Sequence, residues 1–536
     1  MVVSAFAEVC GGLMFSFTRS VAEHFSLNET ETDFEAFGYN PVEHTGLEWN
    51  HYPVDELVYQ EYGQAPQSEI MTYGYNVRPR LINACLPEED ENTTEENADR
   101  AMAWKRHRPS FCCTIWNSLY LGFLISVLSA VIIATFSIFV YYVNYQAILI
   151  CLARPQESIP IKIQWFKTIS EAIALAFSHF WFLINFLFYF RPYQIKRLKR
   201  KLFLISFVFY VPNVFYRVVL QACGIYFSVL THAIKIPGNA LFAVGNGAQS
   251  WVVAKHFATT AVMKKLKLFL WLVILCVVTL VLGIMITYFI YPEYNRQNTR
   301  GKFYIAVFFP LITVVLKGVS RLCLQRLWRI SHPGTSFVLL VPLYYGSSLM
   351  LRLLQVDLRS LESVAFIGMI HGSAEVIERS TVVLADYIYY QIYQRKRVAW
   401  GNFRSPRRER LATDIAIMSM LYEASAIISV NGFLHLHEYY YTADKTPLLL
   451  LKSFVITTAV PLAIEWFFSS VSIAIETRYQ NRPVMAVWRR HWKRHLVVAL
   501  INSLPIAVWS CSSLLIVLEG KFANVKDYCA MPFTHP

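Results

Sequence analysis

Five ionisable side chains lie within one apolar stretch, residues 369–390 (MIHGSAEVIERSTVVLADYIYY). They are His371, Glu375, Glu378, Arg379 and Asp386. On a helical wheel of about 100° per residue, all five fall within about 100° of one another. A charge that faces lipid near the bilayer centre costs at least about 2.5–3.5 kcal/mol on insertion scales. The pattern therefore predicts a membrane-spanning helix whose polar face turns towards a protein interior.

Three other apolar stretches have polar faces of the same kind. Their members are Glu171, Ser178, His179 and Asn185 in the stretch 169–190; Asn213, Arg217, Gln221, Ser228 and His232 in 202–234; and Glu465, Ser469, Ser472 and Glu476 in and just after 447–475. In the stretch 411–434, by contrast, Asp414, Glu423 and Asn431 share no face. Four polar faces predict a shared interior lined with carboxylates, imidazoles and arginines, which suits the binding of protons, cations or polar solutes.

The alternative is that these charges only hold the helices together. Arg379 could pair with Glu375 one turn away, and Arg217 with a carboxylate on a neighbouring helix. Two arginines cannot neutralise all the carboxylates on these faces, however. The sequence therefore predicts that some of these carboxylates are protonated, hydrated or occupied by a cation.

The leading hypothesis is a transporter or channel-like protein that moves an ion, a proton or a small polar solute. Its polar site would comprise the five residues of the first stretch together with Arg217, Glu465, Glu476, Glu171 and His179. In this hypothesis Glu375→Gln abolishes a flux that Leu384→Ala leaves intact. Two alternatives stay open: a receptor that binds a ligand between helices, and an intramembrane lipid-modifying enzyme that uses His371 with a carboxylate as an acid–base pair. No hydrolase, kinase, phosphate-loop or zinc-protease signature occurs, so no cofactor is predicted and transport is favoured over catalysis.

Composition places the chain among membrane proteins. Of its 536 residues 55% are hydrophobic and 16% charged, and the mean hydropathy is +0.38. Residues 1–100 contain 19 acidic side chains against four basic ones. The net charge of +13 is thus the sum of an acidic segment and a basic remainder, and it does not indicate a nucleic-acid partner.

The pattern of apolar stretches predicts an all-α, polytopic helical bundle of about eleven transmembrane helices. The predicted spans are 115–143, 169–190, 202–234, 239–262, 268–291, 303–316, 336–353, 361–393, 411–434, 447–475 and 496–518. Residues 1–104 form an acidic, largely disordered cytoplasmic region, 105–520 the transmembrane domain and 521–536 a short tail. Pro237 is expected to open the fourth span, and Pro310 and Pro342 to interrupt the sixth and seventh spans.

Basic residues fix the predicted orientation. With eleven crossings the strong Lys and Arg clusters fall on one side, so the N-terminus is cytoplasmic and the C-terminus is outside or lumenal. One of these clusters runs from Lys317 to Arg329. Such loops could also bind anionic lipids. The glycosylation triplets at Asn28 and Asn92 conflict with this orientation and are given less weight.

Overall fold

The computed structural model describes most of the chain after residue 110. The described residues are 111–152, 160–190, 194–224, 231–258, 265–327, 330–331, 333–356, 361–394, 406–441, 446–480 and 484–518, and a few single positions at 9, 11–14, 16–17, 21, 403 and 482. The predicted acidic region and C-terminal tail therefore lie almost wholly outside the described residues.

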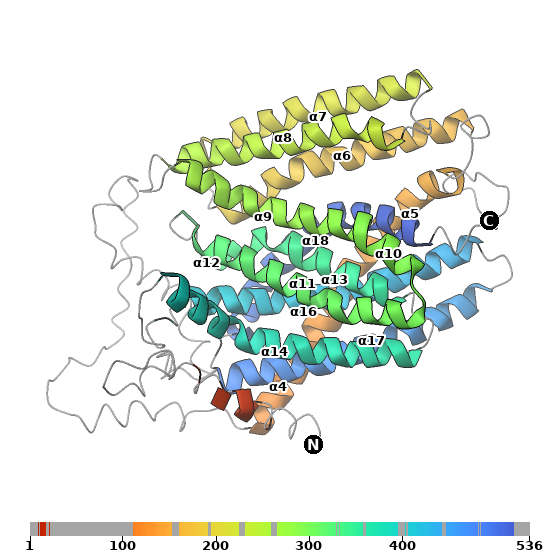
Figure 1. The fold of residues 1–536 in the computed structure, drawn as a ribbon. Helices are drawn as coiled ribbons and strands as arrows, with labels where there is room; N and C mark the ends of the chain where they lie inside the picture. Colours follow the sequence, from red (N-terminus) through yellow and green to blue (C-terminus); the bar gives the residue numbers. More distant parts are fainter. Residues whose placement is uncertain are drawn as a thin grey trace, which may run out of the picture. The chain divides into compact units, whose positions relative to one another are not determined.

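Among the described residues the chain is almost entirely helical and has no strand (Figure 1), so the all-α prediction is confirmed. The helices are α4 (Phe111–Phe123), α5 (Ala130–Leu152), α6 (Ile161–Tyr189), α7 (Lys199–Ala222), α8 (Thr231–Phe257), α9 (Lys265–Met285), α10 (Tyr291–Arg296), α11 (Thr299–Gln325), α12 (Pro333–Ser336), α13 (Val341–Val356), α14 (Leu361–Gln394), α16 (Pro406–Tyr441), α17 (Pro447–Arg478) and α18 (Val484–Leu518). Short π-helical turns, η4 (Leu124–Ser129) and η6 (Ile286–Ile290), and a 3-10 turn, η7 (Phe337–Leu339), join some of them.

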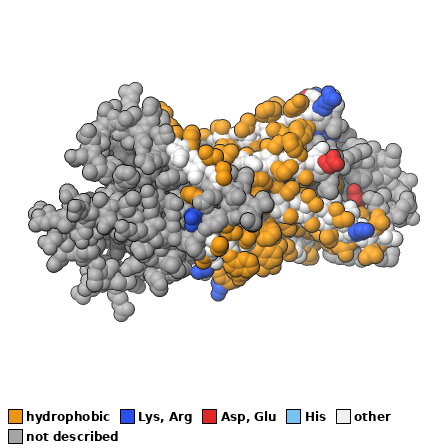
Figure 2. All heavy atoms as spheres, turned by 90° about the horizontal axis from the view of Figure 1, so that it is seen from below, with side chains coloured by type: hydrophobic (Ala, Val, Ile, Leu, Met, Phe, Trp, Pro, Cys, Tyr) orange, Lys and Arg blue, Asp and Glu red, His pale blue; other side chains and the backbone are white. Residues whose placement is uncertain are grey.

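Seven helices are long and apolar enough to cross a membrane. These candidate spans are Cys112–Val143, Ile161–Tyr189, Lys199–Ala222, Lys265–Met285, Arg300–Gln325, Arg408–Tyr439 and Pro447–Arg478. Figure 2 shows hydrophobic side chains over most of the described surface on the face in view, with the few charged side chains towards its two sides. A soluble protein rarely exposes so much continuous apolar surface, so these features indicate an integral membrane protein.

The other four predicted spans coincide with α8, α13, α14 and α18, which fall outside that set of seven. Helix α13 has only 16 residues, fewer than the roughly 20 that a bilayer core requires. Helix α14 contains the ionisable stripe. A count of eleven therefore stays a prediction.

Two predicted boundaries are wrong. The third span does not continue to residue 234, because α7 ends at Ala222 and Gly224 follows with a φ of 71°. Glycine adopts this left-handed conformation without strain and commonly ends helices. His232 therefore belongs to α8 and not to the polar face of α7. Ser228, also predicted on that face, lies outside the described residues.

The sixth span is longer than predicted, because α11 continues through Pro310 to Gln325. The predicted interruption at Pro310 is therefore wrong. Pro237, predicted to open the fourth span, lies inside α8, which begins at Thr231, so that helix start is wrong as well. Membrane helices tolerate proline because neighbouring groups satisfy the freed backbone carbonyls. Lys317 and Arg321, predicted in a cytoplasmic loop, are instead buried on α11.

The chain divides into two compact units. The first unit comprises Met1–Leu121, Val376–Ala416 and Ser470–His491. Part of its apolar core consists of Val382, Val383, Leu384, Tyr387, Phe403 and Ala412. Leu384→Ala would therefore open a core cavity and cost about 2–5 kcal/mol, so it is unsuitable as a neutral control.

The second unit comprises Gly122–Glu375, Ile417–Ser469 and Trp492–Pro536. Within it α6 packs on α7, α7 on α8 and α8 on α9, and these helices lie side by side in Figure 1. Helix α9 contacts α11 and α13, and α11 contacts α13. Ala130 and Ala134 of α5 pack against Ala424 and Ile428 of α16.

Helix α16 has no exposed face along most of its length. Every residue from Glu409 to Phe433 is buried. A helix surrounded by protein can point polar side chains in several directions, whereas a helix at the lipid boundary must confine them to one face. This explains why Asp414, Glu423 and Asn431 share no face on the wheel.

Two glycines one turn apart bring α14 close to α17 in the second unit. A Cβ added to Gly372 would overlap the ring of Phe468, whereas one added to Gly368 would lie 3.7 Å from Ile464. Small residues at this spacing allow close approach of membrane helices. We expect Gly372→Ala to destabilise the protein by about 1–3 kcal/mol through overpacking, since the nearby ring atoms are rigid.

The matched control is Gly368→Ala, where the added methyl group finds ordinary contact and helix propensity improves. Detergent-solubilised variants are compared by their thermal unfolding midpoints. Equal midpoints for the two variants would show that α14 and α17 are not in close contact at Gly372.

Candidate functional site

The ionisable stripe of α14 is divided between the two units, because the boundary falls between Glu375 and Val376. Glu375, Arg379 and Asp386 are buried, with 7%, 5% and 6% of their surface exposed. His371 and Glu378 are partly buried. Met369, Ile370 and Ile377 of the same helix are exposed. Along the stripe, the exposed side chains of this helix are therefore apolar, and the charged ones are buried or partly buried.

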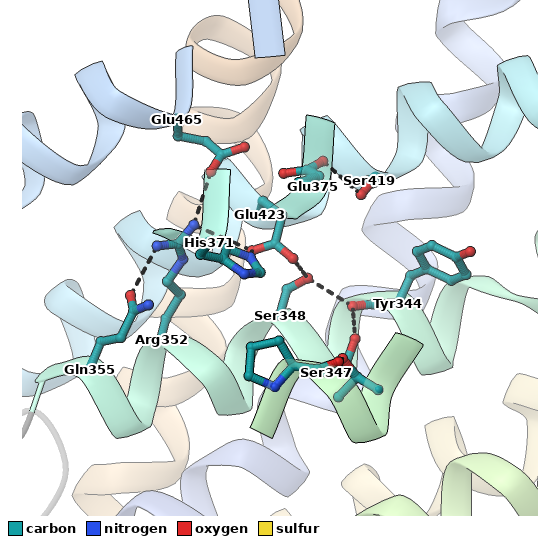
Figure 3. A network of polar contacts seen from close by, with 12 residues as sticks. Tyr344, Ser347, Ser348, Arg352, Gln355, His371, Glu375, Ser419, Glu423 and Glu465 are labelled. Carbon is teal, nitrogen blue, oxygen red and sulfur yellow. Dashed lines mark hydrogen bonds and ion pairs between the residues drawn. The ribbon is translucent and has the colours of Figure 1, made fainter. Parts of the chain in front are cut away.

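His371 and Glu375 belong to a buried charge cluster in the second unit (Figure 3), which we call the Arg352 network. Its other ionisable members are Arg352 of α13, Glu423 of α16 and Glu465 of α17. Arg352 Nη2 lies 2.9 Å from Glu465 Oε2 and 3.4 Å from Glu423 Oε2. Its Nη1 donates to Gln355 Oε1 at 2.9 Å. One guanidinium thus holds two carboxylates from different helices.

His371 of α14 also lies next to the carboxylate of Glu423. Its Nε2 lies 3.4 Å from Glu423 Oε2. Neither ring nitrogen of His371 has a hydrogen-bond partner among the described residues.

A serine hydroxyl donates to each of the three carboxylates. Ser348 Oγ donates to Glu423 Oε1 at 2.6 Å, Ser419 Oγ to Glu375 Oε1 at 3.0 Å and Ser469 Oγ to Glu465 Oε1 at 3.3 Å. Hydroxyl donors partly compensate the cost of removing a carboxylate from water. They neutralise none of its charge.

Helix geometry explains how four helices build this network. Each contributes two polar residues four positions apart, which lie on one face about one turn from each other. The pairs are Ser348 and Arg352 on α13, His371 and Glu375 on α14, Ser419 and Glu423 on α16, and Glu465 and Ser469 on α17. The network therefore follows from one repeated sequence spacing.

The charged side chains of the Arg352 network are deeply buried. Glu423 and Glu465 are 3% and 2% exposed, and Arg352 is 4% exposed. The buried Lys317 of α11 adds a second cation whose charge acts on Glu423, and it lies 4.8 Å from the centre of the Tyr344 ring. Three carboxylates, two permanent cations and the imidazole of His371 are thus gathered in one largely buried site.

A second buried cluster of charged side chains lies in the first unit. Arg379 donates to Glu476 from Nε at 3.2 Å and from Nη2 at 2.7 Å, and Arg482 Nη1 donates to the same carboxylate at 3.3 Å. Arg482 Nε also lies 3.6 Å from Glu409. Arg410 pairs with Asp414 at 3.0 Å. We call this cluster, in which ion pairs join three guanidiniums to three carboxylates, the Arg379 network.

The polar faces of α6 and α7 meet each other. Arg217 Nη1 lies 2.6 Å from Glu171 Oε2, and both side chains are partly exposed. Asn213 Nδ2 lies 3.1 Å from His179 Nε2 and 3.1 Å from the carbonyl oxygen of Gly238. These contacts join neighbouring helices. The prediction that all the polar faces share one interior is therefore too simple.

Sequence reasoning missed three members of the Arg352 network. Arg352 lies at the end of a predicted span and on none of the four predicted polar faces. Lys317 lies in a predicted loop, and the polar residues of the stretch that contains Glu423 share no face. The four-residue spacing from Ser348 to Arg352 and from Ser419 to Glu423 is visible in the sequence. This spacing is the signal that could have identified Arg352 and Glu423 from the sequence.

No group of three or more His, Cys, Asp or Glu side chains that could hold a metal ion occurs in the part of the chain that the structure describes. The donors present are hydroxyls, a guanidinium, an ammonium and an imidazole. This arrangement suits the storage and exchange of protons between buried carboxylates.

Comparisons with protein-family models, with curated proteins and with solved structures find no match to this chain. Function must therefore be argued from the chemistry of the site.

Proposed function

We propose that the protein is a multi-pass membrane transporter that moves a proton, an ion or a small polar solute past the Arg352 network. The observation that supports this function best is that four helices bring three buried carboxylates, an arginine and the imidazole of His371 together in that network. Buried charges are costly. Carboxylates and histidines inside membrane helices are typical of proton and ion pathways.

The proposal retains eleven crossings, a cytoplasmic N-terminus and a C-terminus that is outside or lumenal. Its support is the distribution of basic residues between the predicted spans. Arg489, Arg490 and Lys493 on the first turns of α18 are exposed, as expected for side chains that contact anionic lipid headgroups. Arg494 of the same helix donates to the carbonyl oxygen of Phe188.

Glu375→Gln tests this function. We expect it to reduce flux to the level of protein-free liposomes, because an amide neither ionises nor takes up a proton. Purified protein is reconstituted in liposomes that contain a pH-sensitive dye, and flux is measured with a panel of ion gradients.

The matched control is Glu362→Gln, which removes an exposed carboxylate from the first turn of the same helix and should keep full flux. Equal flux in the two variants, at equal incorporation into liposomes, would contradict the proposed function of this site.

A further inference from the structure

Two adjacent cysteines lie where the chain enters its first candidate membrane span. Helix α4 begins at Phe111, and the span begins at Cys112. The side chains of Cys112 and Cys113 are both exposed. Because these are the first residues of the span, their thiols lie at the border between the bilayer and water.

An exposed aromatic row on α4 supports this placement. Trp116 is 74% exposed and Tyr120 is 60% exposed. They follow Cys112 by four and eight residues, so the three side chains lie on one face of the helix. Tryptophan and tyrosine are enriched at membrane–water interfaces. The cysteines therefore lie next to exposed ring surfaces on which a hydrocarbon chain can pack.

Basic residues precede the cysteine pair in the sequence. Lys105, Arg106 and Arg108 come four to seven residues before Cys112. Such residues attract the anionic lipids of the cytoplasmic leaflet. The orientation proposed above puts this end of the span in the cytoplasm, where fatty acyl-CoA occurs. Cysteines beside a membrane span are typical acceptors of thioester-linked fatty acids.

The other cysteines whose side chains the structure describes lack this combination. Cys276 lies within α9 and is half-buried, and Cys323 lies within α11 and is buried. Cys223 is exposed and directly follows α7. Since α7 is the third predicted span, the proposed orientation puts Cys223 outside or in the lumen. Cys223 is therefore a matched control, exposed at the end of a span but on the other side of the membrane.

The local geometry disfavours two other reactions of paired thiols. Side chains of adjacent helical residues point about 100° apart, so a disulfide between Cys112 and Cys113 would require the first turn of α4 to unwind. A metal site is not supported either, because the described residues contain no group of three His, Cys, Asp or Glu side chains that could hold an ion. Asn117 Nδ2 donates to Cys113 Sγ at 3.4 Å, a surface contact that leaves this cysteine exposed.

We propose that Cys112 and Cys113 are S-acylated, each by a long-chain fatty acyl group from acyl-CoA; this inference rests on the cytoplasmic N-terminus of the proposed function. The cysteine sulfur attacks the carbonyl carbon of the acyl-CoA thioester. A carbon–sulfur bond to the cysteine forms, the bond from that carbon to the CoA sulfur breaks, and the cysteine proton passes to the released CoA thiol. The reaction needs no oxidant or reductant.

The attached chains would run beside Trp116 and Tyr120 into the bilayer. They would hold the start of α4 at the cytoplasmic leaflet, directly after the acidic segment of residues 1–100. A thioester can be hydrolysed, so this attachment is reversible.

Exchange of thioesters for mass tags tests the proposal. The full-length protein is produced in yeast cells, its free thiols are blocked with N-ethylmaleimide, and neutral hydroxylamine releases the acylated thiols for labelling with polyethylene glycol maleimide. Each acylated cysteine then retards the protein by one step in gel electrophoresis. We expect Cys112→Ser combined with Cys113→Ser to lose two steps, each single change to lose one, and Cys223→Ser to lose none.

A double variant that keeps as many steps as the unmodified protein, or a step lost in Cys223→Ser, would overturn the assignment. If the double variant is not recovered in folded form, mass spectrometry of the unmodified protein replaces it. The peptide that contains both cysteines should then carry two acyl groups that hydroxylamine removes, and a peptide without acyl groups would overturn the assignment.

The liposome assay separates this inference from the proposed function. Neither cysteine belongs to the Arg352 network, so the double variant should keep full flux. Flux by a protein that takes up no mass tag would keep transport and reject acylation. Mass tags that disappear in the double variant, together with no flux by the unmodified protein, would keep acylation and reject transport.

Discussion

Replacement of Arg352 by glutamine is expected to lower the free energy of unfolding by about 3–5 kcal/mol. The side chain is 4% exposed and contacts both Glu423 and Glu465. Its removal leaves these buried carboxylates without their shared guanidinium, and the amide supplies hydrogen bonds but no charge. Unfolding of the purified protein by a denaturing detergent, followed by tryptophan fluorescence, measures the loss.

A second substitution tests the cause. Arg352→Gln combined with Glu465→Gln should recover part of the lost stability, because one unpaired carboxylate is then removed. The control Arg300→Gln removes an exposed arginine from the first turn of α11 and should change little. An Arg352→Gln protein as stable as Arg300→Gln would mean that the network does not depend on its guanidinium.

Glu476→Gln, in the first unit, is also expected to lower the free energy of unfolding by about 3–5 kcal/mol. The side chain of Glu476 is fully buried between Arg379 and Arg482, and it accepts hydrogen bonds from both. Substitution by an amide leaves two buried guanidiniums without this carboxylate. The same detergent titration measures the effect.

A double-mutant cycle measures the interaction between Arg379 and Glu476. Arg379→Gln and Glu476→Gln together should cost clearly less than the sum of the two single losses, because each single change leaves an unmatched charge. Arg490→Gln, at an exposed position on α18, is the neutral control. Strict additivity of the two changes would show that Arg379 and Glu476 do not stabilise each other.

The contrast between the two clusters has a consequence for function. The ion pairs of the Arg379 network join guanidiniums to carboxylates. The Arg352 network also contains the imidazole of His371, which lies beside Glu423. Under the proposed function we expect variants of the Arg352 network to alter flux as well as stability, and variants of the Arg379 network to alter mainly stability.

The sequence by itself determined the helical class and much of the span pattern. A charge exposed to lipid is so costly that ionisable residues within an apolar helix must share a buried face. For this reason the wheel placed Glu375, Arg379 and Asp386 together, and all three are buried. Spacing along one helix follows from local geometry alone, so it can be read without a structure.

Only the tertiary structure decided which charges meet. The partner of Glu476 is Arg379, 97 positions away, and Arg352 joins Glu465 across 113 positions. Nothing in a helical wheel specifies which face of one helix packs on which neighbour. Helix α16 is the clearest case. It is buried from Glu409 to Phe433, so Glu423 can be surrounded by protein although its helix has no single polar face.

The ends of α7 and α11 also depended on more than hydropathy. Gly224 ends α7 in a left-handed conformation within a stretch that is apolar on both sides, whereas α11 continues past Pro310 into residues that include Lys317 and Arg321. Local hydropathy predicts a loop for those two cations, because it assumes that a charge lies in water. Burial next to carboxylates of other helices makes the same cations stable inside the protein, and such long-range compensation is invisible along the chain.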